Sequence, residues 1–210
     1  MKLYHGSRTG IHGDISPISR ERCDFGRGFY MGTEKMQPLT LICDAPGAIL
    51  YEVELATEGL NILNLQSDLD WAMLIAYNRG KMESAKGTDL YRQVSQMMNG
   101  YDVVVGDIAN DRMFVVLDRF FNGIITDKAL VASLSALRLG KQYVAITDKG
   151  CSQVRIIDSH VLTDEDRVSL QEQSRNNRSE GIRLADEIAK QYRREGRFFD
   201  EILKAGEANA

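Results

Sequence analysis

The sequence predicts an α+β protein with a mostly antiparallel sheet, followed by a helical extension. Across the first 160 residues, segments with strand patterns outnumber those with helical patterns, and the two kinds do not alternate as they would in a series of βαβ units. Beyond residue 163 only helical periodicity occurs. We therefore expect a domain over residues 1–160 and a helical extension over residues 161–210.

The strands are predicted from runs of apolar, aromatic and β-branched residues. Val103-Val104-Val105 is a continuous run typical of a buried strand, whereas Glu52 and Glu54 alternate with apolar residues and indicate a half-exposed one. The predicted strands cover residues 2–5, 28–32, 48–55, 61–65, 103–106, 142–147 and 153–158. Asp148-Lys149-Gly150 predicts a turn between the last two.

Helices are predicted where apolar residues recur at a spacing of three to four. In the tail, Thr163-Asp164-Glu165-Asp166 predicts a capping box, and the polar run Arg175-Asn176-Asn177-Arg178 predicts an interruption of the helix. The tail is expected either to pack on its own domain or to form an arm for a partner or a second copy. The predicted helices before it cover residues 34–43, 68–79, 88–98, the segment from Asp111 to Asn122, and 126–134.

The amino-acid composition limits the classes of protein to which the chain can belong. The chain has 43% hydrophobic and 27% charged residues, which is typical of a soluble globular protein with a substantial core. A net charge of −4 argues against a large basic surface for nucleic acid. Cys23, Cys43 and Cys151 form no CxxC pair, so we expect free thiols in a reducing, cytoplasmic environment and no metal site. No segment has the apolar length of a membrane span.

The stretch Asp24-Phe25-Gly26-Arg27-Gly28-Phe29-Tyr30-Met31-Gly32-Thr33 concentrates residues suited to ligand binding. Gly26 and Gly28 permit close approach of the backbone to a ligand, and Arg27 offers a planar fork for phosphate or carboxylate. In an extended segment the rings of Phe29 and Tyr30 point in opposite directions, so one can join the core while the other lines a cleft. The same pattern also fits a turn that enters a strand with both rings in the core.

Two further pieces accompany this stretch: Leu3-Tyr4-His5-Gly6-Ser7 upstream and Lys141-Gln142-Tyr143-Val144-Ala145-Ile146 downstream. In this order they resemble the ADP-ribosyltransferase superfamily, in the branch with a His–Tyr–Glu triad. Together with the run from Tyr101 to Asp111, they are similar to a family of uncharacterised bacterial proteins usually grouped with that superfamily. The resemblance covers roughly residues 1–158 and implies a split-sheet ADP-ribosyltransferase-like domain with inserted helices.

The resemblance implies NAD as co-substrate and a mono-ADP-ribosyltransferase of the bacterial toxin or effector type. It places His5 on the ribose next to adenine, the Gly6 backbone on the nicotinamide amide, and Tyr30 against the nicotinamide ring. The bond that breaks joins nicotinamide to ribose, through a transition state similar to that of glycosidases. The remaining candidates for cofactor binding are Ser7, Arg27, Gly28, Phe29 and Asn110.

Gln142 stands where the superfamily pattern has its catalytic glutamate. An amide can orient a ribose hydroxyl but brings no charge, and the loss of such a contact costs a few kcal/mol of transition-state stabilisation. The missing charge could come from Asp107 or Asp111, which follow a buried strand, although Asp107 and Asn110 could equally cap the next helix.

Several functional alternatives follow from Gln142. The chain could transfer ADP-ribose to an unidentified macromolecule, hydrolyse NAD, or bind a nucleotide or a protein with little chemistry. Enzymes of the toxin type are commonly paired with a cognate inhibitor protein, which makes such an antitoxin a further expected partner.

Overall fold

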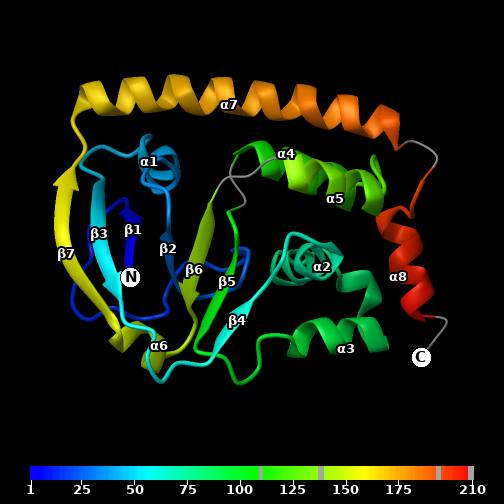
Figure 1. Cartoon of the computed structure of the whole chain (residues 1–210), viewed down its shortest axis with the longest axis horizontal. Helices are drawn as coiled ribbons and strands as arrows, with labels where there is room; N and C mark the ends of the chain where they lie inside the picture. Colours follow the sequence, from blue (N-terminus) through cyan, green and yellow to red (C-terminus); the bar gives the residue numbers. More distant parts are fainter. Residues whose placement is uncertain (109–110, 137–139, 193–194, 208–210) are drawn as a thin grey trace.

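The computed structural model describes residues 1–108, 111–136, 140–192 and 195–207 (Figure 1). Its centre is one seven-stranded sheet in the order β4-β5-β6-β2-β1-β3-β7. All neighbouring strands are antiparallel except β4 and β5, so the predicted α+β class with a mostly antiparallel sheet is confirmed. The strands are β1 (Lys2–Ser7), β2 (Phe29–Gly32), β3 (Ile49–Leu55), β4 (Ile62–Asn64), β5 (Val103–Asp107), β6 (Lys141–Ala145) and β7 (Val154–Val161).

The helices begin at side-chain caps in several places. Asp68, Thr88 and Thr163 each accept a hydrogen bond from a backbone N–H of the first turn that follows. Thr163 and Asp166 form the predicted capping box. The helices are α1 (Met36–Ile42), α2 (Leu69–Asn78), the 3₁₀ helix η1 (Glu83–Ala85), α3 (Asp89–Gln96), α4 (Asp111–Phe121), α5 (Asp127–Ala136), α6 (Asp148–Ser152), α7 (Asp164–Gln191) and α8 (Phe199–Glu207).

Alternation along the strands separates two cores. Val104 and Val144 face the larger core, where Trp71 and Phe25 pack, whereas Val103 and Val105 face a smaller core on the opposite side of the sheet. The larger core needs glycine at position 106, because a Cβ atom there would lie 2.7 Å from Phe25 Cζ and 2.9 Å from Trp71 Nε1. The absence of a side chain lets both rings lie directly on strand β5.

Two local predictions are wrong. Residues 148–150 do not form a simple turn but belong to helix α6, because the Thr147 hydroxyl caps it by accepting from the Gly150 N–H at 3.0 Å. The polar run 175–178 does not interrupt the tail, and α7 continues for 28 residues. Polar residues are tolerated there because that part of the helix has an exposed face, and their helix propensity is only slightly unfavourable.

The C-terminal extension packs on the domain. Helix α7 runs across one end of the sheet, over α1 and then along α4 and α5, and α8 turns back toward α3 (Figure 1). Phe199 is buried, with its ring 5.3 Å from that of Phe120 and 5.4 Å from that of Phe121. Of the helices that the structure describes, none combines the length and apolar character needed to cross a bilayer.

The packing of α8 can be tested with Phe199→Ala. Removing a buried aromatic side chain costs about 3–5 kcal/mol of unfolding free energy, which urea denaturation of the full chain would measure. Phe198→Ala is the matched control, since Phe198 is only half-buried and its loss should cost clearly less. Equal effects of the two substitutions would contradict the docking of α8.

Candidate functional site

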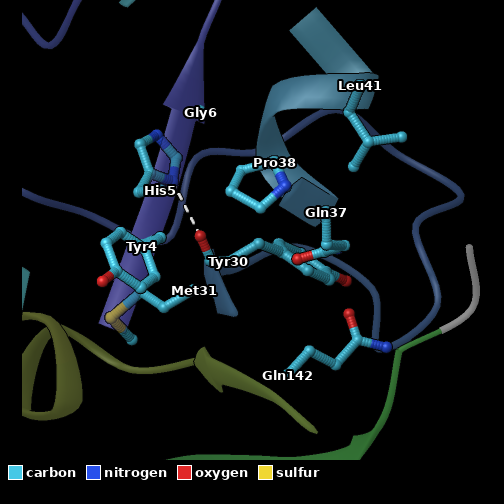
Figure 2. Close-up of a pocket in the computed structure, with 9 residues that line it drawn as sticks. All are labelled: Tyr4, His5, Gly6, Tyr30, Met31, Gln37, Pro38, Leu41 and Gln142. Atoms are coloured by element: carbon cyan, nitrogen blue, oxygen red, sulfur yellow. Dashed lines mark hydrogen bonds between the residues drawn. The ribbon is translucent and has the colours of Figure 1, made fainter. Parts of the chain in front are cut away.

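A pocket opens where strands β1 and β2 separate. The two strands are in register at one pair, Tyr4 and Gly32, although residues 1–33 are all described. The empty space among its lining residues, counted together with the open solvent at its mouth, is about 340 Å³. It is lined by Tyr4, His5, Gly6, Tyr30, Met31, Gln37, Pro38, Leu41 and Gln142 (Figure 2).

The strand register shows which backbone groups face this gap. Met1 and Leu55 exchange hydrogen bonds, so by alternation Leu3 and His5 bond to β3, and the N–H and C=O of Gly6 face β2. The Thr33 N–H donates to Lys141 O, so by the same alternation the backbone groups of Tyr30 face β1. If β1 and β2 continued to pair, Gly6 would lie opposite Tyr30. The pocket lies between these two residues instead.

His5 occupies the gap from the other face of the sheet. Its Nδ1 lies 2.7 Å from the Tyr30 carbonyl oxygen, and its ring stacks on Phe29 with centroids 4.1 Å apart. A carbonyl only accepts, so Nδ1 carries the hydrogen. Burial lowers the pKa of His5 from its ordinary value of 6.5, against the raising effect of the Tyr30 carbonyl, and the imidazole is neutral near pH 7.

Helix α1 forms the wall opposite β2. A Cβ atom on Gly6 would lie 2.9 Å from the Pro38 carbonyl oxygen, so only glycine allows the helix this close to the strand. The Gln37 side chain reaches over Gly32, where a Cβ atom would collide with Gln37 Oε1. Gln37 therefore brings a second amide to the pocket.

The ring of Tyr30 lines the pocket, and its hydroxyl is held by two hydrogen bonds to the backbone. The hydroxyl donates to Gly26 O at 2.8 Å and accepts from the Phe25 N–H at 3.0 Å, which fixes the plane of the ring. Burial, followed by the neighbouring Asp24 and Cys23, raises the pKa of this phenol. Tyr30 is therefore a neutral ring surface and not a proton donor or nucleophile at neutral pH.

Gln142 has a defined amide orientation. It is 3% exposed, and its Nε2 donates to Asp24 Oδ2 at 3.3 Å and to Asp107 O at 3.2 Å. Both partners only accept, so the amide cannot be reversed without losing both bonds. Figure 2 shows the oxygen of Gln142 directed toward Tyr30 and Gln37 and its nitrogen directed away from them.

Behind Gln142 lies a nearly buried ion pair. Asp24 Oδ1 accepts from Arg79 Nη2, and the side chains are 12% and 11% exposed. Asn78 Nδ2 donates to the Asp24 carbonyl oxygen at 3.0 Å, which also fixes the backbone. A carboxylate is thus held directly behind the amide that lines the pocket.

The structure brings together only part of the predicted site. His5, Gly6, Tyr30 and Gln142 meet at the pocket, but the His5 ring lies on the opposite face of the sheet from Tyr30 and Gln142. Asp107 reaches Gln142 with its backbone oxygen, while its carboxylate pairs with Lys141 and Ser67 on that opposite face. Asp107 as a source of charge at the ribose stays a prediction.

The other predicted residues lie outside the lining. Ser7 Oγ donates to Gly10 O at 3.0 Å, and Arg27 pairs with Glu21 at 2.6 Å on the surface. A Cβ atom on Gly28 would lie 2.5 Å from Val144 Cγ1, so this glycine is required by packing against β6. Phe29 is buried in the smaller core. Asn110 is outside the described residues, and so is the side chain of Asp111.

Three polar or charged residues that shape the site, besides the lining residues Tyr4, Met31, Pro38 and Leu41, were not predicted. Gln37 lies on a short helix without a pattern of its own, Arg79 caps the end of α2, and Asp24 opens the glycine–aromatic stretch. Asp24 was the one that the sequence could have suggested, because a carboxylate beside two glycines and two aromatics is a candidate for any site built there. Among the described ranges, no group of three side chains is arranged to hold a metal ion.

Comparison with known proteins identifies the family. Residues 1–156 match the model of a family described as "Protein of unknown function (DUF3990)". The chain belongs to this family. Neither the curated proteins nor the solved structures contain a significant match. The shared region ends within β7, so α7 and α8 lie beyond it.

This result corrects the family assignment made from sequence. The matching family is one of unknown function and no ADP-ribosyltransferase family matches, so the predicted membership of that superfamily is wrong. The resemblance depended on short pieces that local structure also explains: Gly28 is required by packing, and Phe29 and Met31 belong to the core.

The neutral His5 predicts a pH dependence of stability. Because its pKa is lowered on folding, the unfolded chain binds a proton that the folded chain does not, and stability falls as pH drops below about 6.5. The slope from this group is at most about 1.4 kcal/mol per pH unit. Urea unfolding of wild type and His5→Phe at pH 7.5 and 5.5 should show a smaller loss in the variant.

Phenylalanine keeps the stacking on Phe29 but cannot titrate. Loss of the hydrogen bond to the Tyr30 carbonyl lowers stability at both pH values, so the difference between the two pH values isolates the titration of the imidazole. Glu54, Asp102, Asp166 and Asp186 have lowered pKa values, and their stabilisation is lost at more acidic pH in both proteins. Identical losses in wild type and variant would show that His5 does not titrate differently on folding.

Proposed function

We propose that this pocket binds the nicotinamide riboside part of NAD and that the protein is an NAD-dependent mono-ADP-ribosyltransferase. The single observation that carries the proposal is the convergence of Gly6, Tyr30 and Gln142 on one neutral pocket. It does not depend on a superfamily assignment. The near-separation of the sheet between β1 and β2 supports the split-sheet arrangement that was expected.

The pocket has the features that an aromatic carboxamide requires. The N–H and C=O of Gly6, side by side on one strand edge, can bond the C=O and NH₂ of a carboxamide, as a neighbouring strand would. The face of Tyr30 offers a fixed surface for stacking of the nicotinamide ring.

Gln142 is suited to the ribose. Its Oε1 can accept a hydrogen bond from a ribose hydroxyl and hold the sugar while the bond to nicotinamide breaks. The transition state gains positive charge on the ribose, so an oxygen dipole directed at it is favourable. Asp24 adds a negative charge behind that dipole without entering the pocket.

The diphosphate has a candidate contact at the rim. Arg8 Nη2 donates to the carbonyl oxygen of Leu41, a lining residue, at 3.2 Å and pairs with Asp44 at 2.9 Å. Its side chain is 56% exposed, so the guanidinium can turn to a phosphate with little loss. We assign it this role ahead of Arg27 because Arg8 contacts a lining residue, whereas Arg27 pairs with Glu21.

A second function is favoured by the uncharged lining. No pocket-lining side chain among the described residues carries a formal charge at neutral pH, and Gln142 cannot act as a general base. The protein would then bind NAD or another nucleotide with little turnover, or hydrolyse NAD slowly. The first proposal, a toxin-type transferase acting in the cytoplasm, includes three partners. They are a macromolecule that accepts ADP-ribose, a cognate inhibitor protein, and a partner for the exposed face of α7.

The proposal predicts nicotinamide release from NAD, with labelled ADP-ribose transferred to a macromolecule in a lysate. Gln142→Ala should lower kcat/KM for nicotinamide release roughly 100-fold or more, because it removes a contact made to the developing charge. Gln93→Ala, an exposed glutamine on α3, is the matched control and should leave the rate unchanged.

The outcome separates the candidate functions. Free ADP-ribose without labelled macromolecule would identify a glycohydrolase, and NAD binding by calorimetry without release of nicotinamide would identify a binding module. Absence of both binding and release would overturn the assignment of the pocket to NAD.

A further inference from the structure

We propose that Asp24 is a positioning residue that holds the Gln142 amide with its oxygen toward the pocket, so that this point of the pocket accepts ligand groups that donate a hydrogen bond. The inference rests on the proposed function for one detail, the ribose hydroxyl as the donating group. The orientation itself rests on four residues from separate parts of the chain: Asp24, Arg79, Asp107 and Gln142.

The hydrogen-bond roles leave one arrangement. Arg79 can only donate, and it holds Asp24 Oδ1; Asp24 Oδ2 is left for Gln142. Nε2 of Gln142 has two hydrogens, one for Asp24 and one for the Asp107 carbonyl. Its oxygen is then available to the pocket, where no donor from the described residues is recorded against it.

Burial makes this arrangement selective. The side chains of Asp24 and Arg79 are 12% and 11% exposed, so water competes little for their hydrogen bonds. The negative charge of Asp24 also polarises the amide, since a charge-assisted bond at the nitrogen increases the negative charge on the oxygen. The pocket therefore presents a fixed, strengthened acceptor.

Asp24→Asn tests whether Asp24 orients the Gln142 amide, because only one of the two donors beside residue 24 can then be accepted. Asparagine has one acceptor, and both of its neighbours, Arg79 and Gln142, are donors. The guanidinium is the stronger donor and keeps the oxygen, so the NH₂ of the introduced asparagine faces Gln142. Gln142 then meets a donor at one of its amide hydrogens while the Asp107 carbonyl still accepts from the other, so its oxygen is held toward the pocket less firmly.

The readout is a ratio of affinities. Two NAD analogues with fluorine in place of the 2′ or 3′ hydroxyl of the nicotinamide ribose can accept but not donate at that point. Wild type should bind NAD at least about 10-fold more tightly than one of these analogues, since fluorine would face the Gln142 oxygen. In Asp24→Asn the ratio should fall toward one, because the orientation of the Gln142 amide then depends on the Asp107 carbonyl alone. Calorimetric titration measures it without turnover.

Controls separate positioning from stability. Asp186→Asn makes the same change at another Asp–Arg pair, with Arg119, and should keep the wild-type ratio. Arg79→Gln weakens the ion pair but leaves Asp24 facing Gln142, so it should lower stability and keep the preference for NAD. If Asp24 only stabilised the fold, Asp24→Asn would weaken NAD and analogues equally, and an unchanged ratio overturns the proposal.

A measurement without a variant covers the case in which Asp24→Asn does not fold. In the ¹⁵N spectrum of the wild-type chain, both side-chain amide hydrogens of Gln142 should exchange slowly, because both are bonded and buried. Fast exchange of either hydrogen would refute the fixed orientation. If exchange is slow but NAD does not bind, the positioning stands and the proposed function fails.

Discussion

The hydrogen bond between the His5 imidazole and the Tyr30 carbonyl is the contact on which the site depends. In an uninterrupted sheet that carbonyl would accept from the backbone of β1, and the two strands would close. A side chain inserted from the opposite face satisfies the same acceptor at a greater strand separation. The strand edges therefore stay apart without leaving a buried carbonyl unpaired, and Gly6 keeps its own backbone groups directed into the space.

The second constraint is the charge kept behind the pocket. A carboxylate in a poorly hydrated place is unfavourable unless it is paired, and Asp24 is paired by Arg79 and Gln142. These partners come from the end of α2 and the start of β6, so the ion pair also joins the helical layer to the sheet. The pair keeps its charges behind Gln142, and neither of its residues lines the pocket.

The sequence predicted the elements better than the site. Strand positions were correct because β-branched and alternating runs have local causes, as at 103–105 and 49–55. His5, Tyr30 and Gln142 were selected by motif and do meet at the pocket, but their directions depended on register, which no single segment encodes. The Asp24–Arg79 pair joins residues 55 positions apart and has no sequence pattern. The predicted superfamily membership was wrong for the same reason, because short motifs do not determine how the whole chain is arranged.

Helix α7 has a mechanical role that its position implies. Arg167 and Gln171 donate to the carbonyl oxygen of Cys43, and Arg167 also reaches that of Asp44, so α7 holds the C-terminal end of α1. The other face of α1 is the pocket wall. At its far end the same helix is tied to α4 through Asp186 and Arg119. Helix α7 lies outside the family match and is anchored at both ends, to α1 and to α4. A displacement of its α4 end is therefore transmitted along the helix to the pocket wall.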